Sequence, residues 1–170
     1  VVIVMSAGEG KASNIYRSSD DGKSWQHVKQ ASHPKAFFDC VSFEDNQTGW
    51  LYGDSIDGQL FILKTIDGGK SWNEEPLPIK ALPNEGGFAS SGTCVNSATG
   101  KPLLVGTGNA QTARLLVNDK TWKAIESPFM AGEASGIFSL QRNGQSLFAA
   151  GGSLKTPEQQ AQAYEYDLLT

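Results

Sequence analysis

The chain has 170 residues, 39% of them hydrophobic and 19% charged, which is the balance of a folded protein and not of a disordered segment. The formal net charge is −4 and the basic residues are scattered, so we expect no nucleic-acid partner and no surface for anionic lipids. No apolar run reaches the ~20 residues that cross a bilayer, so we expect no membrane span.

The predicted elements are short strands separated by polar turns, and their order repeats along the chain. The first unit, 1–33, opens with the apolar strand VVIVMSAG and has one strand fewer than the pattern that follows. The second unit, 34–80, shows the whole pattern. Its strands are predicted at 37–45, 49–54, 58–65 and 72–78.

The two later units follow the same order of strands. In the unit 81–128 we expect strands at 88–96, 101–108, 113–119 and 120–128. In the unit 129–170 we expect strands at 135–143, 145–153 and 163–170. The polar stretch 156–165 contains enough Pro, Glu and Gln for one helical turn, but we interpret it mainly as a loop insertion.

Four strands in each unit of about 47 to 50 residues are typical of the blades of a β-propeller. The predicted fold class is therefore all-β: a single partial β-propeller of four-stranded antiparallel blades, with about three and a half blades in this chain. Propellers close with about 4 to 8 blades. We expect the chain to be a fragment of a longer propeller, and the alternative is a homodimer in which two chains complete one ring.

One short motif marks the repeat in the first two units. It places a hydroxyl residue, an Asp, a Gly and a Trp at fixed offsets, and the second copy lies 47 residues after the first. The two copies are Ser18, Asp20, Gly22 and Trp25, and Thr65, Asp67, Gly69 and Trp72. An Asp side chain closes a turn by accepting hydrogen bonds from the backbone N–H groups that follow it, and Gly permits a positive φ. We therefore predict two structural turns, each with its Trp ring buried at the start of an outer strand.

The third unit keeps a Trp at position 122 but loses the motif before it. Asn118 and Asp119 stand there instead, and this pair suits a tight hairpin turn. A catalytic or metal site would be lost by this replacement, whereas one turn can substitute for another. The third unit therefore supports the structural interpretation, and we expect neither a metal nor a cofactor at these positions.

The segments SSDDGKSW and TIDGGKSW resemble the Asp-box, which is also called the bacterial neuraminidase repeat. Together with VSFEDNQTGWLYGD they make the chain similar to propellers of the photosystem II stability/assembly factor type. The resemblance implies that the boxes lie at blade edges, away from the ligand site. It also implies export, so we expect a periplasmic or extracellular protein whose signal segment is not present in this chain.

Candidate ligand-binding residues lie in the loops that enter the first strand of each unit, because these loops converge at the channel mouth of a propeller. They are Lys35, Asp39, Glu85, Ser90, Ser91, Glu133 and Ser135. Charged groups gathered in a concave site indicate ligand binding. The plainer interpretation, which the residue types alone favour, is that they are solvated loop residues and strand caps. The function we predict is a non-enzymatic scaffold that binds a protein or another ligand at this face.

The alternative function is an exported glycoside hydrolase or carbohydrate-binding protein with a glycan ligand, because sialidases carry the same boxes. Sialidases use a Tyr nucleophile and, by resemblance, an arginine cluster. Arg17 and Arg114 lie eight residues before a Trp, as Lys64 does, and we expect all three at equivalent positions far from the channel. Asp39 and Glu133 are the candidate catalytic carboxyl groups. Without an arginine cluster or a Tyr–Glu pair, the sequence favours a protein that is not an enzyme.

The two cysteines, Cys40 and Cys94, lie on equivalent first strands of neighbouring units. Buried free thiols behave as small apolar groups and are common, and we favour that state. A disulfide requires Cα atoms within about 7 Å, which the sequence does not specify.

Overall fold

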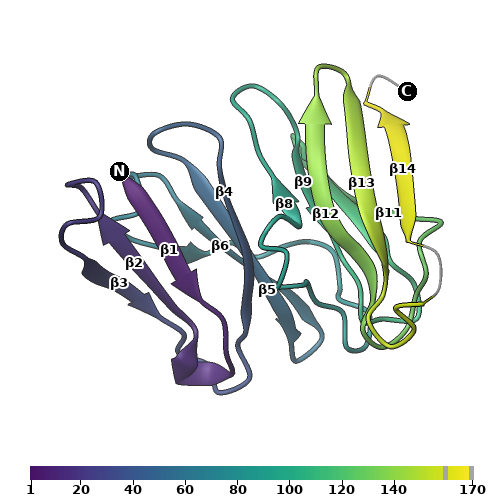
Figure 1. Ribbon diagram of the computed structural model, residues 1–170. Coiled ribbons are helices and arrows are strands. Elements are labelled where there is room, and N and C mark those ends of the chain that lie inside the picture. The colour runs from purple at the N-terminus through teal and green to yellow at the C-terminus, as the bar shows by residue number, and fades with distance from the viewer. Residues whose placement is uncertain (159–160, 169–170) are drawn as a thin grey trace.

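The computed structural model describes residues 1–158 and 161–168, and they form an all-β protein (Figure 1). The described residues contain fourteen strands and one short 3-10 helix, Gly10–Ala12. The strands form four antiparallel sheets that follow one another from the N-terminus to the C-terminus. The predicted all-β class is therefore confirmed.

Each sheet is a meander in which strands that are consecutive in sequence are hydrogen-bonded neighbours. The first sheet contains β1 (Val2–Ser6), β2 (Asn14–Ser18) and β3 (Gln26–Gln30). The second contains β4 (Phe38–Phe43), β5 (Gly49–Ile56), β6 (Gln59–Thr65) and β7 (Asn73–Glu74). The third contains β8 (Val95–Asn96), β9 (Leu103–Gly106), β10 (Arg114–Asp119) and β11 (Thr121–Glu126). The fourth contains β12 (Ser135–Asn143), β13 (Ser146–Ser153) and β14 (Gln162–Asp167).

Two predicted strands are much shorter than expected. Of the segment 88–96 only Val95–Asn96 is a strand, because the N–H groups of Ser91 and Gly92 turn back to the carbonyl of Phe88. Of the segment 72–78 only Asn73–Glu74 is a strand, and the prolines at 76 and 78 lack the N–H groups that would extend it.

The interpretation of 156–165 as a loop insertion is wrong for its second half. Strand β14 begins at Gln162 and pairs with β13 from Gly151 to Ser146. Pro157 and Glu158 form a turn, residues 159–160 lie outside the described residues, and so do the last two positions of the strand predicted at 163–170.

Three hydrophobic clusters fill the spaces between adjacent sheets. The apolar runs of the central strands are buried on both faces, because alternate side chains point to opposite sides of a sheet. Leu51 of β5 packs with Ile15 and Phe38 between the first and second sheets. Tyr52 packs with Val105 between the second and third. A third cluster lies between the third and fourth sheets.

The two ends of the strands define two faces of the molecule. We call loop face the end at which β4, β8 and β12 begin and at which β5 and β9 finish. We call box face the opposite end, where the box turns follow β2 and β6. The first strands of the second, third and fourth sheets are neighbours. The hydroxyl oxygen of Ser42 in β4 lies 2.9 Å from that of Ser97, which follows β8, and the hydroxyl oxygen of Thr93, which precedes β8, lies 2.9 Å from that of Ser139 in β12.

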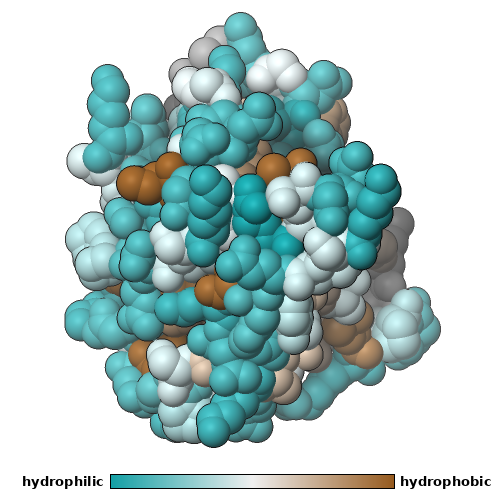
Figure 2. Space-filling view, turned by 90° about the vertical axis from the view of Figure 1, so that its left-hand side faces the viewer, coloured by the Kyte–Doolittle hydropathy of each residue, from teal (hydrophilic) through white to brown (hydrophobic). Residues whose placement is uncertain are grey.

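No helix in the described part of the chain has the length and hydropathy needed to cross a membrane. Figure 2 views the molecule from the side of the first sheet, where hydrophobic residues are scattered among hydrophilic ones.

Candidate functional site

A pocket of about 790 Å³ opens on the loop face. Three candidate residues line it, Lys35, Glu85 and Glu133, and they come from the loops before β4, β8 and β12. Much of the remaining wall comes from Asp54, Ser55, Asn109, Ala110 and Gln111. Sequence reasoning missed these residues because it considered only the loops before the first strands. In an antiparallel sheet the second strand ends where the first begins, and that rule identifies them.

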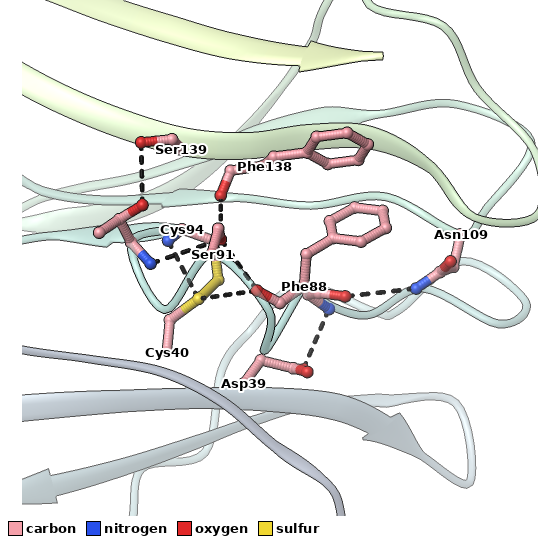
Figure 3. The surroundings of a disulfide bond; sticks show 10 residues. Asp39, Cys40, Phe88, Ser91, Cys94, Asn109, Phe138 and Ser139 are labelled. Atoms are coloured by element: carbon pink, nitrogen blue, oxygen red, sulfur yellow. Dashed lines mark hydrogen bonds between the residues drawn. A yellow bond between two sulfur atoms is a disulfide. The ribbon is translucent and has the colours of Figure 1, made fainter. Parts of the chain in front are cut away.

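The other four candidates do not line the pocket. Asp39 and Ser135 are buried, and the hydroxyl of Ser135 donates to the carbonyl of Glu133 at 3.2 Å. Ser90 is exposed. The hydroxyl of Ser91 contacts the carbonyls of Phe88 and Phe138, so it connects the loop before β8 to strand β12 (Figure 3).

Asp39, which is buried, and Asp54, which is half-buried in the pocket wall, form a carboxyl pair. Strand β4 has a β-bulge at Asp39: Phe38 pairs with Gly53, but Cys40 pairs with Tyr52. A bulge changes the direction of a side chain, and here the Asp39 carboxyl meets the Asp54 carboxyl in a hydrogen bond. Asp39 is 2% exposed, whereas Asp54 reaches the pocket wall.

Burial determines the protonation of this pair. It raises the pKa of Asp39 to about 8, and the nearby charge of Asp54 adds to the rise. Burial also raises the pKa of Asp54. Two adjacent carboxyl groups resist losing both protons, so at neutral pH the pair keeps a proton on Asp39. The hydrogen bond favours the neutral form of Asp39 and the charged form of Asp54, so Asp54, on the pocket side, ionises before Asp39.

Two consecutive glycines allow the backbone to approach the pair. The N–H of Gly87 donates to Oδ2 of Asp39 at 3.1 Å. A Cβ atom at Gly86 would lie 1.7 Å from Oδ1 of Asp54, and one at Gly87 would lie 2.8 Å from Cβ of Asp39. Any side chain at Gly86 would therefore displace the Asp54 carboxyl group.

Glu85, at the pocket wall, is bound by Arg114 in a buried ion pair. Nε of Arg114 lies 2.8 Å from Oε1 of Glu85, and Nη2 lies 2.5 Å from Oε2. Thr107 donates to Oε1 at 2.8 Å and the backbone N–H of Leu82 donates to Oε2 at 2.9 Å. Glu85 is fully buried, so its carboxylate is a structural group at the base of the wall and not a free acid.

The expectation that Arg114 lies far from the candidate site is wrong. In the first two units the eight residues before the Trp include the loop of the box, so Lys64 pairs with Asn73 at the box face. In the third unit they run along a straight hairpin in which Asn118 pairs with Trp122. Arg114 therefore lies at the loop face, one strand length from the hairpin turn. The same spacing of eight residues before a Trp thus places Lys64 at the box face and Arg114 at the opposite face.

The other two arginines do not join Arg114. Nε of Arg17 donates to the carbonyl of Gly68 at 2.8 Å, on the box face. Nη2 of Arg142 donates to the carbonyl of Pro102 at 2.8 Å. Each arginine thus serves a different contact between neighbouring sheets.

Tyr52 lies close to the same acidic groups. It is fully buried, its hydroxyl has no hydrogen-bond partner, and burial together with the charges of Glu85, Asp39 and Asp54 raises its pKa. Tyr52 and Asp54 project from the same side of β5, two residues apart. The unpaired hydroxyl therefore lies near the carboxyl groups of Asp39, Asp54 and Glu85.

Exposed ion pairs neutralise the other charges of the pocket rim. Nζ of Lys35 lies 3.1 Å from Oδ1 of Asp57, and His33 lies 3.7 Å from the same carboxylate. Lys155 forms an ion pair with Glu133. Of the two carboxyl groups considered for glycoside cleavage, Glu133 lines the pocket and Asp39 does not.

A disulfide bond joins Cys40 and Cys94, with a Cα–Cα distance of 5.7 Å (Figure 3). The favoured expectation of free thiols is therefore wrong. The sequence could not decide this, because the distance depends on how closely the second and third sheets approach. Cys40 follows Asp39 on β4, and near the bond the rings of Phe88 and Phe138 pack edge to face with centroids 4.4 Å apart.

The two boxes have nearly the same hydrogen bonds. In the second, the Thr65 hydroxyl donates to Oδ1 of Asp67 at 2.8 Å, and the Ser71 hydroxyl donates to Oδ2 at 2.6 Å. The N–H groups of Lys70 and Ser71 also donate to Asp67, and the N–H of Gly69 donates to Thr65. These bonds lower the pKa of Asp67 to about 2.

In the first box, Asp20 accepts bonds from Ser18, from the Ser24 hydroxyl and from the Ser24 N–H, and its pKa is also about 2. The Gly22 N–H donates to Ser18 at 2.8 Å. Trp72 is 3% exposed, but Trp25 is 44% exposed, so the first ring is not buried as expected. In the third unit the tight hairpin is present, but Lys120, and not Asn118 or Asp119, has the positive φ.

Within the described residues, no three His, Cys, Asp or Glu side chains are grouped to hold a metal ion. No family model, curated protein or solved structure matches the chain.

Proposed function

We propose that this chain is an exported, non-enzymatic scaffold of the Asp-box β-propeller type, and that it binds a protein through the loop-face pocket. The observation that carries the proposal is the pocket itself. Its wall combines segments from three consecutive sheets, and its volume of about 790 Å³ lies within the ~300–1,000 Å³ typical of ligand sites.

The arrangement of the sheets supports a blade-like role for each of them. Four meander sheets pack face to face in chain order, and their first strands lie beside one another. The two box turns lie at the face opposite the pocket, where their carboxylates are fully used in local hydrogen bonds. The disulfide is compatible with an oxidising, extracytoplasmic location.

Site-specific photocrosslinking in cells of the producing organism tests the proposal. A photoreactive residue at Gln111, an exposed position of the pocket wall, is expected to give a discrete adduct with a partner protein. The matched control carries the same residue at Lys70, an exposed position of the box face. Equal adducts from both positions, or none from Gln111, would refute the proposed binding face.

A glycan-binding or glycoside-hydrolysing role is the second candidate, and one observation favours it. Asp54 lies at the pocket wall, and its hydrogen bond with Asp39 favours the ionised carboxylate, which is the form that a general base requires. Release of sugar from a panel of glycosides, abolished by Asp54→Asn with folding retained, would establish this role in place of the scaffold. Absence of cleavage by the native protein would remove it.

A further inference from the structure

We propose that the loop-face pocket receives the cationic end of a lysine or arginine side chain of the partner protein, and that the Asp39–Asp54 carboxyl pair is its seat. The inference rests on the proposed function, because it names the chemistry of the partner at the same pocket. It depends on the distribution of charge around the pocket and on one buried hydroxyl group.

The charges of the pocket are balanced except at Asp54. Glu85 is neutralised by Arg114, and Glu133 by Lys155. Lys35 is engaged by Asp57, together with His33. Among the described residues, Asp54 is thus the carboxyl group of the pocket wall that has no cationic partner. Its hydrogen-bond partner is the protonated carboxyl group of Asp39. A cation entering the pocket finds one unbalanced negative site.

The surroundings of the pair explain why the protein itself does not supply the cation. Gly86 and Gly87 press their backbone against both carboxyl groups and leave no space for another side chain on that side. Arg114 approaches from β10, but Glu85 holds its Nε and Nη2 groups. The open side of the pair is therefore the side that faces the pocket.

The hydroxyl of Tyr52 is a second polar group near the pair that lacks a partner within the protein. It is completely buried without a partner, although it lies close enough to Asp39, Asp54 and Glu85 for their charges to raise its pKa. An unpaired buried hydroxyl costs about 1–3 kcal/mol of stability, so proteins rarely keep one without a reason.

Binding of a cation at Asp54 is expected to depend on pH. A positive charge at Asp54 lowers the pKa of Asp39, because it offsets the negative charge that adds to the effect of burial. Binding therefore strengthens as the pH rises toward 8. A neutral hydroxylated ligand would have no such dependence.

The test uses two small peptide mimics that differ in charge. N-acetyl-lysine methylamide and its neutral counterpart N-acetyl-norleucine methylamide are titrated into the folded protein, and amide chemical shifts are followed by NMR. The lysine compound is expected to shift the Gly86 and Gly87 resonances, and to bind about tenfold more tightly than the norleucine compound, which corresponds to one charge-assisted contact. Equal binding of the two compounds overturns the proposal.

Three variants make the assignment specific. Asp54→Asn is expected to weaken binding of the lysine compound about tenfold and to abolish its pH dependence. Asp39→Asn keeps the charge of Asp54, so it is expected to keep binding but lose the pH dependence. Asp45→Asn is the matched control, since Asp45 is an exposed carboxylate in the turn after β4 on the box face, and it is expected to change the affinity less than about threefold. An unchanged affinity of Asp54→Asn for the lysine compound would show that the carboxyl pair is not the binding site.

The outcome is separable from the test of the proposed function. If Gln111 crosslinks to a partner but the lysine compound fails to bind, only the inference about the cation falls. If the compound binds at Asp54 but no partner crosslinks at the loop face, the cation site stands and the scaffold function falls.

Discussion

Arg114 and Glu85 form a two-point ion pair that joins the start of β10 to the loop before β8. Both side chains are buried, and the Arg114 guanidinium also donates to the carbonyl of Lys80 at 3.0 Å. This pair shapes the wall of the loop-face pocket, and it gives the first prediction.

Removing one member of the pair leaves the other charge buried without a partner. Arg114→Met is therefore expected to lower the free energy of unfolding by about 3–5 kcal/mol, measured by urea denaturation. The control is Lys155→Met, which breaks the exposed pair with Glu133 and is expected to cost about 0–1 kcal/mol. Similar losses in the two variants would contradict the buried character of the first pair.

The disulfide is expected to stabilise the contact between the second and third sheets. It closes a loop with a sequence separation of 54, for which the chain-entropy relation gives about 4 kcal/mol. The double variant Cys40→Ala and Cys94→Ala should lose up to this amount in urea denaturation. Both cysteines are fully buried, so the native protein should show no reactive thiol before unfolding. Two thiols titratable in the oxidised, denatured protein would show that the bond is absent.

The two box tryptophans are expected to differ in their contribution to stability. Trp72 is buried and its ring packs edge to face on Phe43 at 5.8 Å, whereas Trp25 is partly exposed. Trp72→Ala should therefore cost about 3–5 kcal/mol, and Trp25→Ala distinctly less. Thermal and urea denaturation of the two variants measures the difference. Equal losses would mean that the first ring is also buried in solution.

The carboxyl groups predict two opposite effects of pH on stability. The pKa of Asp39 is raised to about 8, so the folded state binds a proton that the unfolded state releases above about 4. This contribution is present at low pH and is lost as the pH rises from about 4 to about 8. The double variant Asp39→Asn and Asp54→Asn should remove that slope.

The box carboxylates act in the other direction. The pKa of Asp20 and of Asp67 is lowered to about 2, so their stabilisation is present above the usual value of 3.8 and is lost as the pH falls toward 2. Asp67→Asn should weaken this acid-side loss, as urea denaturation at pH 2 to 5 would show. A steeper acid-side loss in the variant would contradict the hydrogen bonding of the box.

The unpaired hydroxyl of Tyr52 makes a final prediction. Tyr52→Phe removes a buried polar group without breaking a hydrogen bond, so the variant should be at least as stable as the native protein. Tyr52→Leu, which also removes the packing of the ring, is the contrasting control and should be less stable. A loss of more than about 1 kcal/mol in Tyr52→Phe would show that the hydroxyl has a partner in solution.

The sequence by itself determined the local features of this protein. Alternating apolar strands and polar turns were sufficient for the all-β class, and the box residues predicted turns closed by a side chain, because these depend on neighbours within a few residues. The same reasoning failed where distant segments decide the outcome. It placed Arg114 by counting residues, and only the register of β10 with β11 shows that this residue reaches Glu85.

Only the tertiary structure decided the composition of the candidate site. Three features depend on how closely neighbouring segments pack: the hydrogen bond between Asp39 and Asp54, the disulfide between Cys40 and Cys94, and the exposure of Trp25. Side-chain burial and the distance between segments far apart in the chain set the charge of a carboxyl group and the state of a thiol. Neither quantity is encoded in the spacing of residues along one strand. The sequence therefore indicated three residues of the pocket wall, Lys35, Glu85 and Glu133, but not the chemistry of the pocket.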